Sequence, residues 1–297
     1  MSLKRFQGLG VAMVTPFDER GRIDEAALRR HVDFLIEGGA HVLVPCGTTG
    51  ESATMSGDEQ RRVVAVTVEQ AAGRVPVMAG AGANATAEAV ARTRAVVEAG
   101  ADAVLTVSPY YNKPTHTGLL AHYRAVAEAA ERPVFIYNVP GRTGSNVRPE
   151  TVLELAGEPH IAGVKEASGD LGQVMTLLRE RPDGFLVLSG EDDLTLPMIA
   201  AGADGVISVV GNEVPHAMAR MCEAALAGDF GCAREIHYRL LALMRANFVQ
   251  TNPIPVKAAL RIMGRMEAHY RLPLTPLDPA FEPVLRDALA AAGVDLP

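Results

Sequence analysis

The chain has only three cysteines, Cys46, Cys222 and Cys232, and no two of them form a Cys-x-x-Cys pair. An odd, widely spaced set argues against a disulfide framework or a zinc site and is typical of a reducing cytosol. The N-terminal residues lack the apolar core of a signal peptide, and no run of about 18 apolar residues occurs. We therefore expect a cytoplasmic protein that does not enter a membrane.

Clusters of lysine and arginine are also missing, and the formal net charge is −7. This argues against nucleic acid as a partner, because neutralising phosphates requires clustered basic residues. The eight histidines are scattered, with no His-x-His or His-x-x-x-His pair. The sequence therefore offers no ligand set for a metal-dependent aldolase, and we predict no metal site.

What the sequence does contain is a strand and helix pattern that repeats eight times before residue 228. The expected strands are the apolar runs 11–16, 41–46, 75–79, 103–107, 133–138, 161–165, 185–189 and 205–210. Continuous apolar runs are typical of parallel strands covered by helices. Eight such units predict an α/β fold, a (β/α)8 TIM barrel in residues 1–228. Residues 229–297 show helical patterns without strands and are expected to form a C-terminal helical domain.

Two expected helices begin with recognisable capping residues. Asp24 is a plausible N-cap for the helix that ends at Gly38. Ser56 and Glu59 have the spacing of a capping box, which predicts a helix from there through Ala72.

One lysine, Lys165, ends the apolar run 161–165. Burial disfavours the charged ammonium, and a neutral amine attacks ketones to form Schiff bases. The alternative is a solvated or salt-bridged lysine at a strand end, and for an isolated strand that alternative is the more common one.

The remaining polar clusters favour the catalytic interpretation because they follow strands, where barrel enzymes carry their active sites. The clusters are Thr15-Pro16, residues 47–51, 80–84, 108–113, 137–142, 165–168 and 189–192. The loops after helices are plain by comparison.

Three of these clusters have a chemical interpretation. Tyr137 ends the strand next to that of Lys165, so its phenol can approach the amine and move protons during imine formation. The loop Gly47-Thr48-Thr49-Gly50-Glu51 combines hydroxyls with exposed N–H groups, as a carboxylate-binding nest does. The guanidinium of Arg142 suits a substrate carboxylate. The alternatives are a rim aromatic, a helix-capping turn and a surface salt bridge.

Together these residues resemble the dihydrodipicolinate synthase (4-hydroxy-tetrahydrodipicolinate synthase) family, one of the Schiff-base pyruvate lyases that include N-acetylneuraminate lyase. The resemblance covers nearly the whole chain. It is carried by residues 47–54, 79–88, 108–114, Tyr137-Asn-Val-Pro-Gly-Arg-Thr-Gly144, Gly163-Val-Lys-Glu-Ala-Ser168, 205–208 and Asn252-Pro-Ile-Pro-Val-Lys257. Thr48-Thr49 and Arg142 favour the synthase branch.

The resemblance implies that Lys165 forms a Schiff base with pyruvate and that the product with L-aspartate 4-semialdehyde is 4-hydroxy-tetrahydrodipicolinate, on the diaminopimelate route to lysine. It implies no metal or organic cofactor, and a homotetramer built as a dimer of tight dimers. The implied residue roles are a proton relay (Tyr137, Thr48 and Tyr111, the last from a neighbouring subunit), pyruvate carboxylate binding (Thr49), semialdehyde carboxylate binding (Arg142) and backbone carbonyls near the reacting centre (Gly190, Ile207).

The family's lysine feedback site is matched in part, by Ser52, Ala53, Asn84, Glu88 and Tyr110. Gly57 and Gln60 stand where inhibited members often carry larger residues or histidine. Inhibition by L-lysine is therefore a hypothesis.

Two other functions remain open from the sequence. Another 2-keto acid aldolase or lyase of the same superfamily would share Lys165 and Tyr137, whereas Arg142 and Thr48-Thr49 argue for the synthase. A catalytically silent barrel that binds a keto acid should have lost Lys165, Tyr137 or Thr48, and all three are present.

Overall fold

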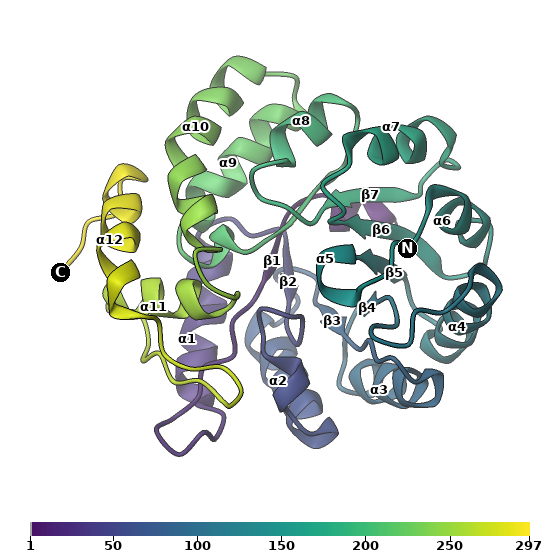
Figure 1. The fold of residues 1–297 in the computed structure, drawn as a ribbon, viewed down its shortest axis with the longest axis horizontal. Coiled ribbons are helices and arrows are strands. Elements are labelled where there is room, and N and C mark those ends of the chain that lie inside the picture. Colours follow the sequence, from purple (N-terminus) through teal and green to yellow (C-terminus); the bar gives the residue numbers. More distant parts are fainter. Residues whose placement is uncertain (1) are drawn as a thin grey trace.

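Eight parallel strands form one sheet in the computed structural model, which describes residues 2–297 (Figure 1). The strands are β1 (Gly8–Ala12), β2 (Val42–Val44), β3 (Met78–Gly80), β4 (Ala103–Val107), β5 (Val134–Asn138), β6 (Ile161–Glu166), β7 (Leu186–Ser189) and β8 (Gly205–Ser208). Their order is β2-β1-β8-β7-β6-β5-β4-β3, and a parallel bridge between Leu43 and Val77 joins the two ends. The sheet therefore closes, which confirms the predicted (β/α)8 barrel.

Helices surround this barrel and cover its outer face (Figure 1). They are α1 (Glu25–Glu37), α2 (Gly57–Ala71), α3 (Thr86–Glu98), α4 (His116–Ala130), α6 (Pro149–Leu155), α7 (Leu171–Glu180), α8 (Thr195–Ala200) and α9 (Pro215–Leu226). The short helix α5 (Pro140–Thr143) lies instead over the mouth of the barrel (Figure 1). The predicted caps are confirmed, since Asp24 accepts from the N–H of Ala27 and Ser56 forms the capping box with Glu59.

Alternate residues of each strand face two different cores, because side chains change sides with a period of two. In β5, Val134 and Ile136 pack outward against the helices. Phe135 and Tyr137 point into the barrel. The inward residues fill the lower barrel with apolar side chains, and the site residues lie above them.

Strand β1 begins and ends earlier than predicted, at Gly8–Ala12 rather than 11–16. Its register places Gly8 beside Gly205 of β8, where a Cβ on Gly205 would lie 2.1 Å from the backbone oxygen of Gly8. The two backbones need glycine for this close approach, but glycine weakens a strand signal. The short helix α5 (Pro140–Thr143) was also not predicted.

After Gly228 the chain contains helices α10 (Phe230–Ala246), α11 (Ile254–Ile262) and α12 (Glu282–Ala291), and no strand. Figure 1 shows them grouped on one side of the barrel, beside α1 and α9. This confirms the helical extension, while its status as a separate domain stays a prediction. No helix in residues 2–297 combines the length and the apolar character needed to cross a membrane.

Candidate active site

Lys165 and Tyr137 lie side by side at the mouth of the barrel, because the β5–β6 register pairs them directly. The Lys165 Nζ is 4.2 Å from the centre of the Tyr137 ring. Both side chains are buried, with 5% and 7% of their surface exposed. Among residues 2–297, no carboxylate forms an ion pair with Lys165. The amine is therefore buried and not engaged by an ion pair, which leaves it available to attack a ketone.

Among residues 2–297, one other lysine is strongly buried, Lys257 of α11, and it forms an ion pair. Its Nζ is 2.6 Å from Oε1 of Glu51, and both side chains are fully buried. Burial lowers the pKa of Lys257 and Glu51 acts against this, but the amine is bound by a carboxylate and by the backbone oxygen of Thr15, so it is not available to a substrate. This contrast distinguishes Lys165 as the candidate nucleophile.

Two residues that face away from the cavity hold the ends of β5 and β6 together. They are Asn138 and Glu166, and neither was predicted from the sequence. Asn138 and Glu166 follow Tyr137 and Lys165 and are paired in the same register. The Asn138 Nδ2 donates to both carboxylate oxygens of Glu166, at 3.1 and 3.0 Å. The Asn138 Oδ1 accepts from the N–H of Val147 at 2.9 Å. The network therefore ties both strands to the segment after α5.

The loop Gly47–Glu51 follows β2 and forms one wall of the cavity. Thr48 and Thr49 both line the cavity, as predicted for a carboxylate-binding nest. The Thr49 hydroxyl accepts a hydrogen bond from Nδ2 of Asn252, at 3.0 Å. Asn252 also lines the cavity, so the C-terminal extension completes the site.

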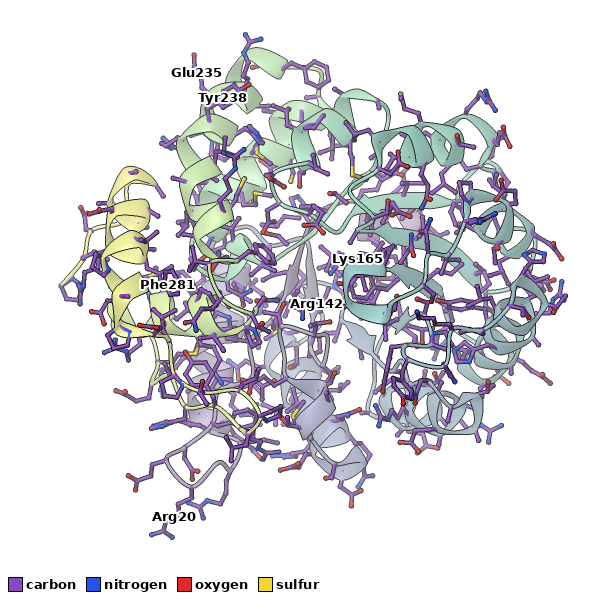
Figure 2. All side chains as sticks on the ribbon, viewed as in Figure 1. Arg20, Arg142, Lys165, Glu235, Tyr238 and Phe281 are labelled. Carbon is purple, nitrogen blue, oxygen red and sulfur yellow. The ribbon has the colours of Figure 1, made fainter. Side chains whose placement is uncertain are left out.

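Gly190 and Arg142 also line the cavity around Lys165. Gly190 follows β7, and a Cβ at this position would lie 3.1 Å from Cε of Lys165 and 2.5 Å from Cβ of Ala167. A side chain here would displace the lysine, which explains the glycine. Arg142 lines the cavity from α5, and Figure 2 shows it near Lys165. Among the described residues, no carboxylate lies within ion-pair distance of its guanidinium.

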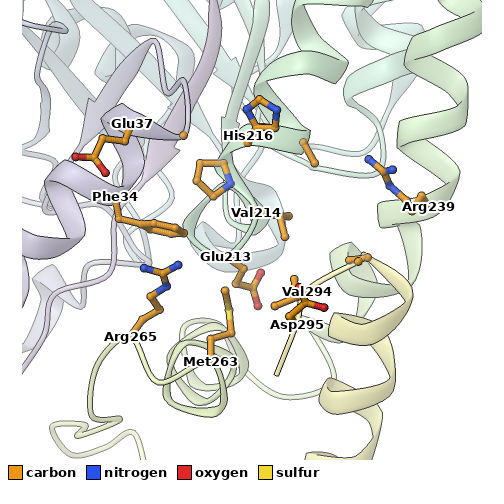
Figure 3. A pocket seen from close by; sticks show the side chains of 15 residues that line it. Phe34, Glu37, Glu213, Val214, His216, Arg239, Met263, Arg265, Val294 and Asp295 are labelled. Atoms are coloured by element: carbon orange, nitrogen blue, oxygen red, sulfur yellow. The ribbon is translucent and has the colours of Figure 1, made fainter. Parts of the chain in front are cut away.

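A larger hollow lies elsewhere, between α1, α9, α10 and the C-terminal residues (Figure 3). Its volume is about 650 Å³, against about 40 Å³ for the cavity beside Lys165. Its described lining includes no lysine and no tyrosine, and burial raises the pKa of its carboxyl Glu213 well above the ordinary value. The smaller cavity, which contains Lys165, is therefore the candidate active site.

The model of the dihydrodipicolinate synthetase family matches residues 5–292 of the chain. The chain belongs to this family. A protein of Maridesulfovibrio salexigens named 4-hydroxy-tetrahydrodipicolinate synthase is 53% identical over 290 residues, which is 97% of this chain and 99% of that protein.

Solved structures of this family superpose on nearly the whole chain. The chloride-inhibited dihydrodipicolinate synthase of Acinetobacter baumannii, solved with pyruvate, has a TM-score of 0.95 and 43% identity over 97% of this chain and 99% of that one. The enzyme of Cyanidioschyzon merolae, solved with lysine bound, has a TM-score of 0.95 and 41% identity over 98% of this chain and 99% of that one.

Two residues expected at the site from the family resemblance lie away from the cavity wall. Ile207 is buried inside the barrel in β8 and is not part of the described lining. Tyr111 follows β4, has 89% of its surface exposed and has a φ of 72°, in the left-handed region. A single copy of the chain therefore does not bring Tyr111 to Lys165.

The residues predicted for a feedback site in this family lie near α2, α3 and the loop after β4. Ser52 and Ala53 form a 3-10 turn directly after Glu51. Glu88 is ion-paired with Arg92 at 2.8 Å. Gln60 is buried and donates to the backbone oxygen of Ser52 at 2.8 Å, so its side chain supports this turn from inside.

Proposed function

We infer that the chain condenses pyruvate with L-aspartate 4-semialdehyde to give 4-hydroxy-tetrahydrodipicolinate, the first committed step of the diaminopimelate route to lysine. The observation that carries this inference is the buried amine of Lys165, without a counter-ion and against the ring of Tyr137. The neutral amine attacks the ketone carbon of pyruvate, and loss of water gives an iminium.

The iminium draws electrons from the methyl group of pyruvate, so that a proton leaves and an enamine forms. The enamine carbon then attacks the aldehyde of the second substrate. Tyr137 lies against the lysine and its hydroxyl can donate and accept protons, and Thr48 lies in the same cavity. Exclusion of water by the buried site protects the iminium from hydrolysis.

Two substrate carboxylates need separate binding sites in this reaction. The hydroxyl and the backbone of Thr49 suit the carboxylate of pyruvate, because Asn252 orients the hydroxyl through a hydrogen bond. Arg142 suits the carboxylate of the semialdehyde, because its guanidinium is unpaired by any described carboxylate. The backbone carbonyl of Gly190, which lines the cavity, is proposed to lie near the reacting centre, and the family resemblance implies the same role for Ile207.

We also propose that Tyr111 completes the proton relay of a neighbouring copy, within a tight dimer that pairs again into a tetramer. An aromatic side chain held in a left-handed conformation and almost fully exposed is suited to enter a partner's site. Mixing two inactive variants, Lys165→Ala and Tyr111→Phe, tests this arrangement.

In a mixed dimer, the Lys165→Ala subunit supplies an intact Tyr111 to the partner's intact Lys165. Random mixing should then restore about a quarter of the wild-type rate, because half of the dimers are mixed and each has one complete site. If the mixture stays as inactive as its components, Tyr111 does not act across the interface.

L-Lysine is the proposed feedback inhibitor, bound near Ser52, Ala53, Asn84, Glu88 and Tyr110. The turn of Ser52 and Ala53 adjoins the catalytic loop, so a ligand held there can displace Thr48 and Thr49. Inhibition of the rate by millimolar L-lysine is the expected result, and an unchanged rate removes the hypothesis.

The decisive test of function is a coupled assay of pyruvate with L-aspartate 4-semialdehyde, run beside other aldehydes. Turnover that is selective for the semialdehyde and is abolished in Lys165→Ala is expected. Faster turnover with a sugar aldehyde would instead identify another aldolase of the same superfamily.

A further inference from the structure

The loop after β7 places one carboxylate, that of Glu191, in the wall of the cavity that holds Lys165 and Arg142. The backbone of Glu191 is fixed on both sides. Its N–H donates to Oγ of Ser189 at 3.2 Å, and its carbonyl accepts from Thr195 Oγ1 at 3.0 Å. Among residues 2–297, no hydrogen bond or ion pair engages the carboxylate itself. The carboxylate is therefore oriented by its backbone and free to bind a ligand.

Glu191 is the only acid among the described residues that line this cavity. The two acids that follow it, Asp192 and Asp193, do not offer a carboxylate to the cavity. Asp192 is buried and accepts from the N–H groups of Val209 and Val210, at 3.0 and 2.8 Å. Asp193 does not line the cavity. A cationic group that enters the site therefore has one carboxylate to meet.

The second substrate of the proposed function brings such a cation, because it is an amino acid with an aldehyde at its other end. Its carboxylate suits Arg142, and its ammonium is repelled by Arg142. After the carbon–carbon bond has formed, this ammonium must lose a proton before its nitrogen can attack the iminium. The reaction therefore needs both an anion to hold the ammonium and a base to deprotonate it.

We propose that Glu191 binds the ammonium of the semialdehyde and acts as the base for ring closure. The proposal rests on the proposed function and assigns a catalytic residue to its last stage. The semialdehyde lies across the cavity, with its carboxylate on Arg142, its ammonium on Glu191 and its aldehyde facing the enamine on Lys165.

The ring-closing step involves no change of oxidation state. The Glu191 carboxylate takes one proton from the ammonium, and the freed lone pair forms a C–N bond to the iminium carbon while the C=N π electrons move to the Lys165 nitrogen. The Lys165 nitrogen then takes the proton from Glu191, and the ring nitrogen releases one proton to solvent. The Lys165 C–N bond breaks, so the free amine leaves and the ring C=N forms. Loss of the last N–H proton to solvent gives the neutral cyclic imine.

The surroundings of Glu191 suit a group that both accepts and returns a proton. Burial raises the pKa of its carboxyl to about 7, with Asp192 and Asp193 acting in the same direction and Lys165 and Arg142 against it. A base with a pKa near the working pH exchanges protons most effectively. The charged and titratable groups that face it come from three elements and its own loop: Tyr137 of β5, Lys165 of β6, Arg142 of α5, and Asp192 and Asp193.

The test compares Glu191→Gln, which keeps the shape but removes the base, with Asp193→Asn, which makes the same charge change outside the cavity. We expect Glu191→Gln to lower kcat with L-aspartate 4-semialdehyde by about 10²-fold or more, the usual contribution of a general base. Asp193→Asn should stay within about threefold of wild type, since it removes only a long-range charge from the site.

Borohydride quenching followed by mass spectrometry identifies the step that is lost. In Glu191→Gln, an uncyclised adduct with the mass of pyruvate plus the semialdehyde should accumulate on Lys165, since only its release is slow. With 4-oxobutanoate, which has no amine, Glu191→Gln and wild type should form the carbon–carbon adduct at equal rates. The acidic limb of the kcat profile, with an apparent pKa near 7, should disappear in Glu191→Gln.

Three results would overturn the proposal. One is a Glu191→Gln variant with wild-type kcat and pH profile, and another is a slow variant whose Lys165 carries only the pyruvate adduct. The third is an equal loss of rate with 4-oxobutanoate, which would indicate disturbed geometry. Absence of the pyruvate adduct in wild type would instead refute the proposed function, so the two failures are distinguishable.

Discussion

Replacing Lys257 by methionine tests how strongly the C-terminal extension holds the catalytic loop. The Lys257 Nζ lies 2.6 Å from Oε1 of Glu51 and 3.1 Å from the backbone oxygen of Thr15. The rings of Phe17 and Tyr270 flank the ammonium, with centres 4.6 and 5.0 Å away. The pair is fully buried, so no water replaces the lysine in the variant.

In Lys257→Met, Glu51 keeps one long hydrogen bond, from the N–H of Arg271 at 3.4 Å. Removing one partner of a buried ion pair costs about 3–5 kcal/mol. Glu51 limits the loss by taking a proton. For a carboxyl with an ordinary pKa of about 4.3, this costs about 3.7 kcal/mol at pH 7. We therefore expect the free energy of unfolding to fall by about 3–4 kcal/mol.

Urea unfolding at one fixed protein concentration measures this loss, because subunit association also contributes to stability. The double variant Glu51→Gln/Lys257→Met is the matched control. It should be more stable than Lys257→Met, since no buried charge is left without a partner.

The loss should also depend on pH, with a defined sign. A proton on Glu51 stabilises the folded variant, so the variant regains stability as the pH falls and loses it as the pH rises. At about 1.36 kcal/mol per pH unit, the loss relative to wild type should shrink to about 1 kcal/mol at pH 5. A loss below about 1 kcal/mol at pH 7, or one that is equal at both pH values, would refute this reasoning.

Three further predictions concern the cavity, the barrel and the thiols. Arg142→Ala should lower kcat/KM for the semialdehyde by about 10- to 100-fold, because a hydrogen bond to a charged group is lost. Trapping of pyruvate on Lys165 should be unchanged, and its loss would contradict the role assigned to Arg142. Gly163→Ala should lower stability by about 1–3 kcal/mol in urea unfolding, because its Cβ would lie 2.5 Å from the backbone oxygen of Leu186; a neutral effect would show that β6 can shift. Burial raises the pKa of Cys46 to about 12, so iodoacetamide at pH 8 should label the partly exposed Cys232 first, and rapid labelling of Cys46 would contradict its burial.

The strands and helices were predictable where local signals agree with the tertiary structure. Strand 103–107 and helix 86–98 have the predicted bounds, because an apolar run and a regular period each mark a complete element. The strand at 11–16 was misplaced. Its true start is fixed by glycines that pair closely with β8, and such pairing leaves no apolar signal in the sequence.

The cavity was predictable in part. Lys165 and Tyr137 lie near the ends of strands, whereas Thr48, Thr49 and Arg142 follow strands, and the barrel brings all five to one mouth. Their individual roles stay predictions until they are measured.

The supporting contacts were not predictable because they join distant parts of one chain. Glu51 and Lys257 are 206 residues apart, and nothing local to either residue indicates the other. The sequence shows that Glu191 belongs to an acidic loop. It does not show that the carboxylate has no hydrogen-bond partner, because that depends on which side chains the fold places around it.

The central claim is that Lys165 is the nucleophile, and trapping with pyruvate and borohydride tests it most directly. Mass spectrometry of the digested protein should find a pyruvate-sized adduct on the peptide that contains Lys165. Lys257 is the internal control, since it is also buried but is bound by the Glu51 carboxylate. An adduct on Lys165 and none on Lys257 is the predicted result. An unmodified Lys165 would contradict the account.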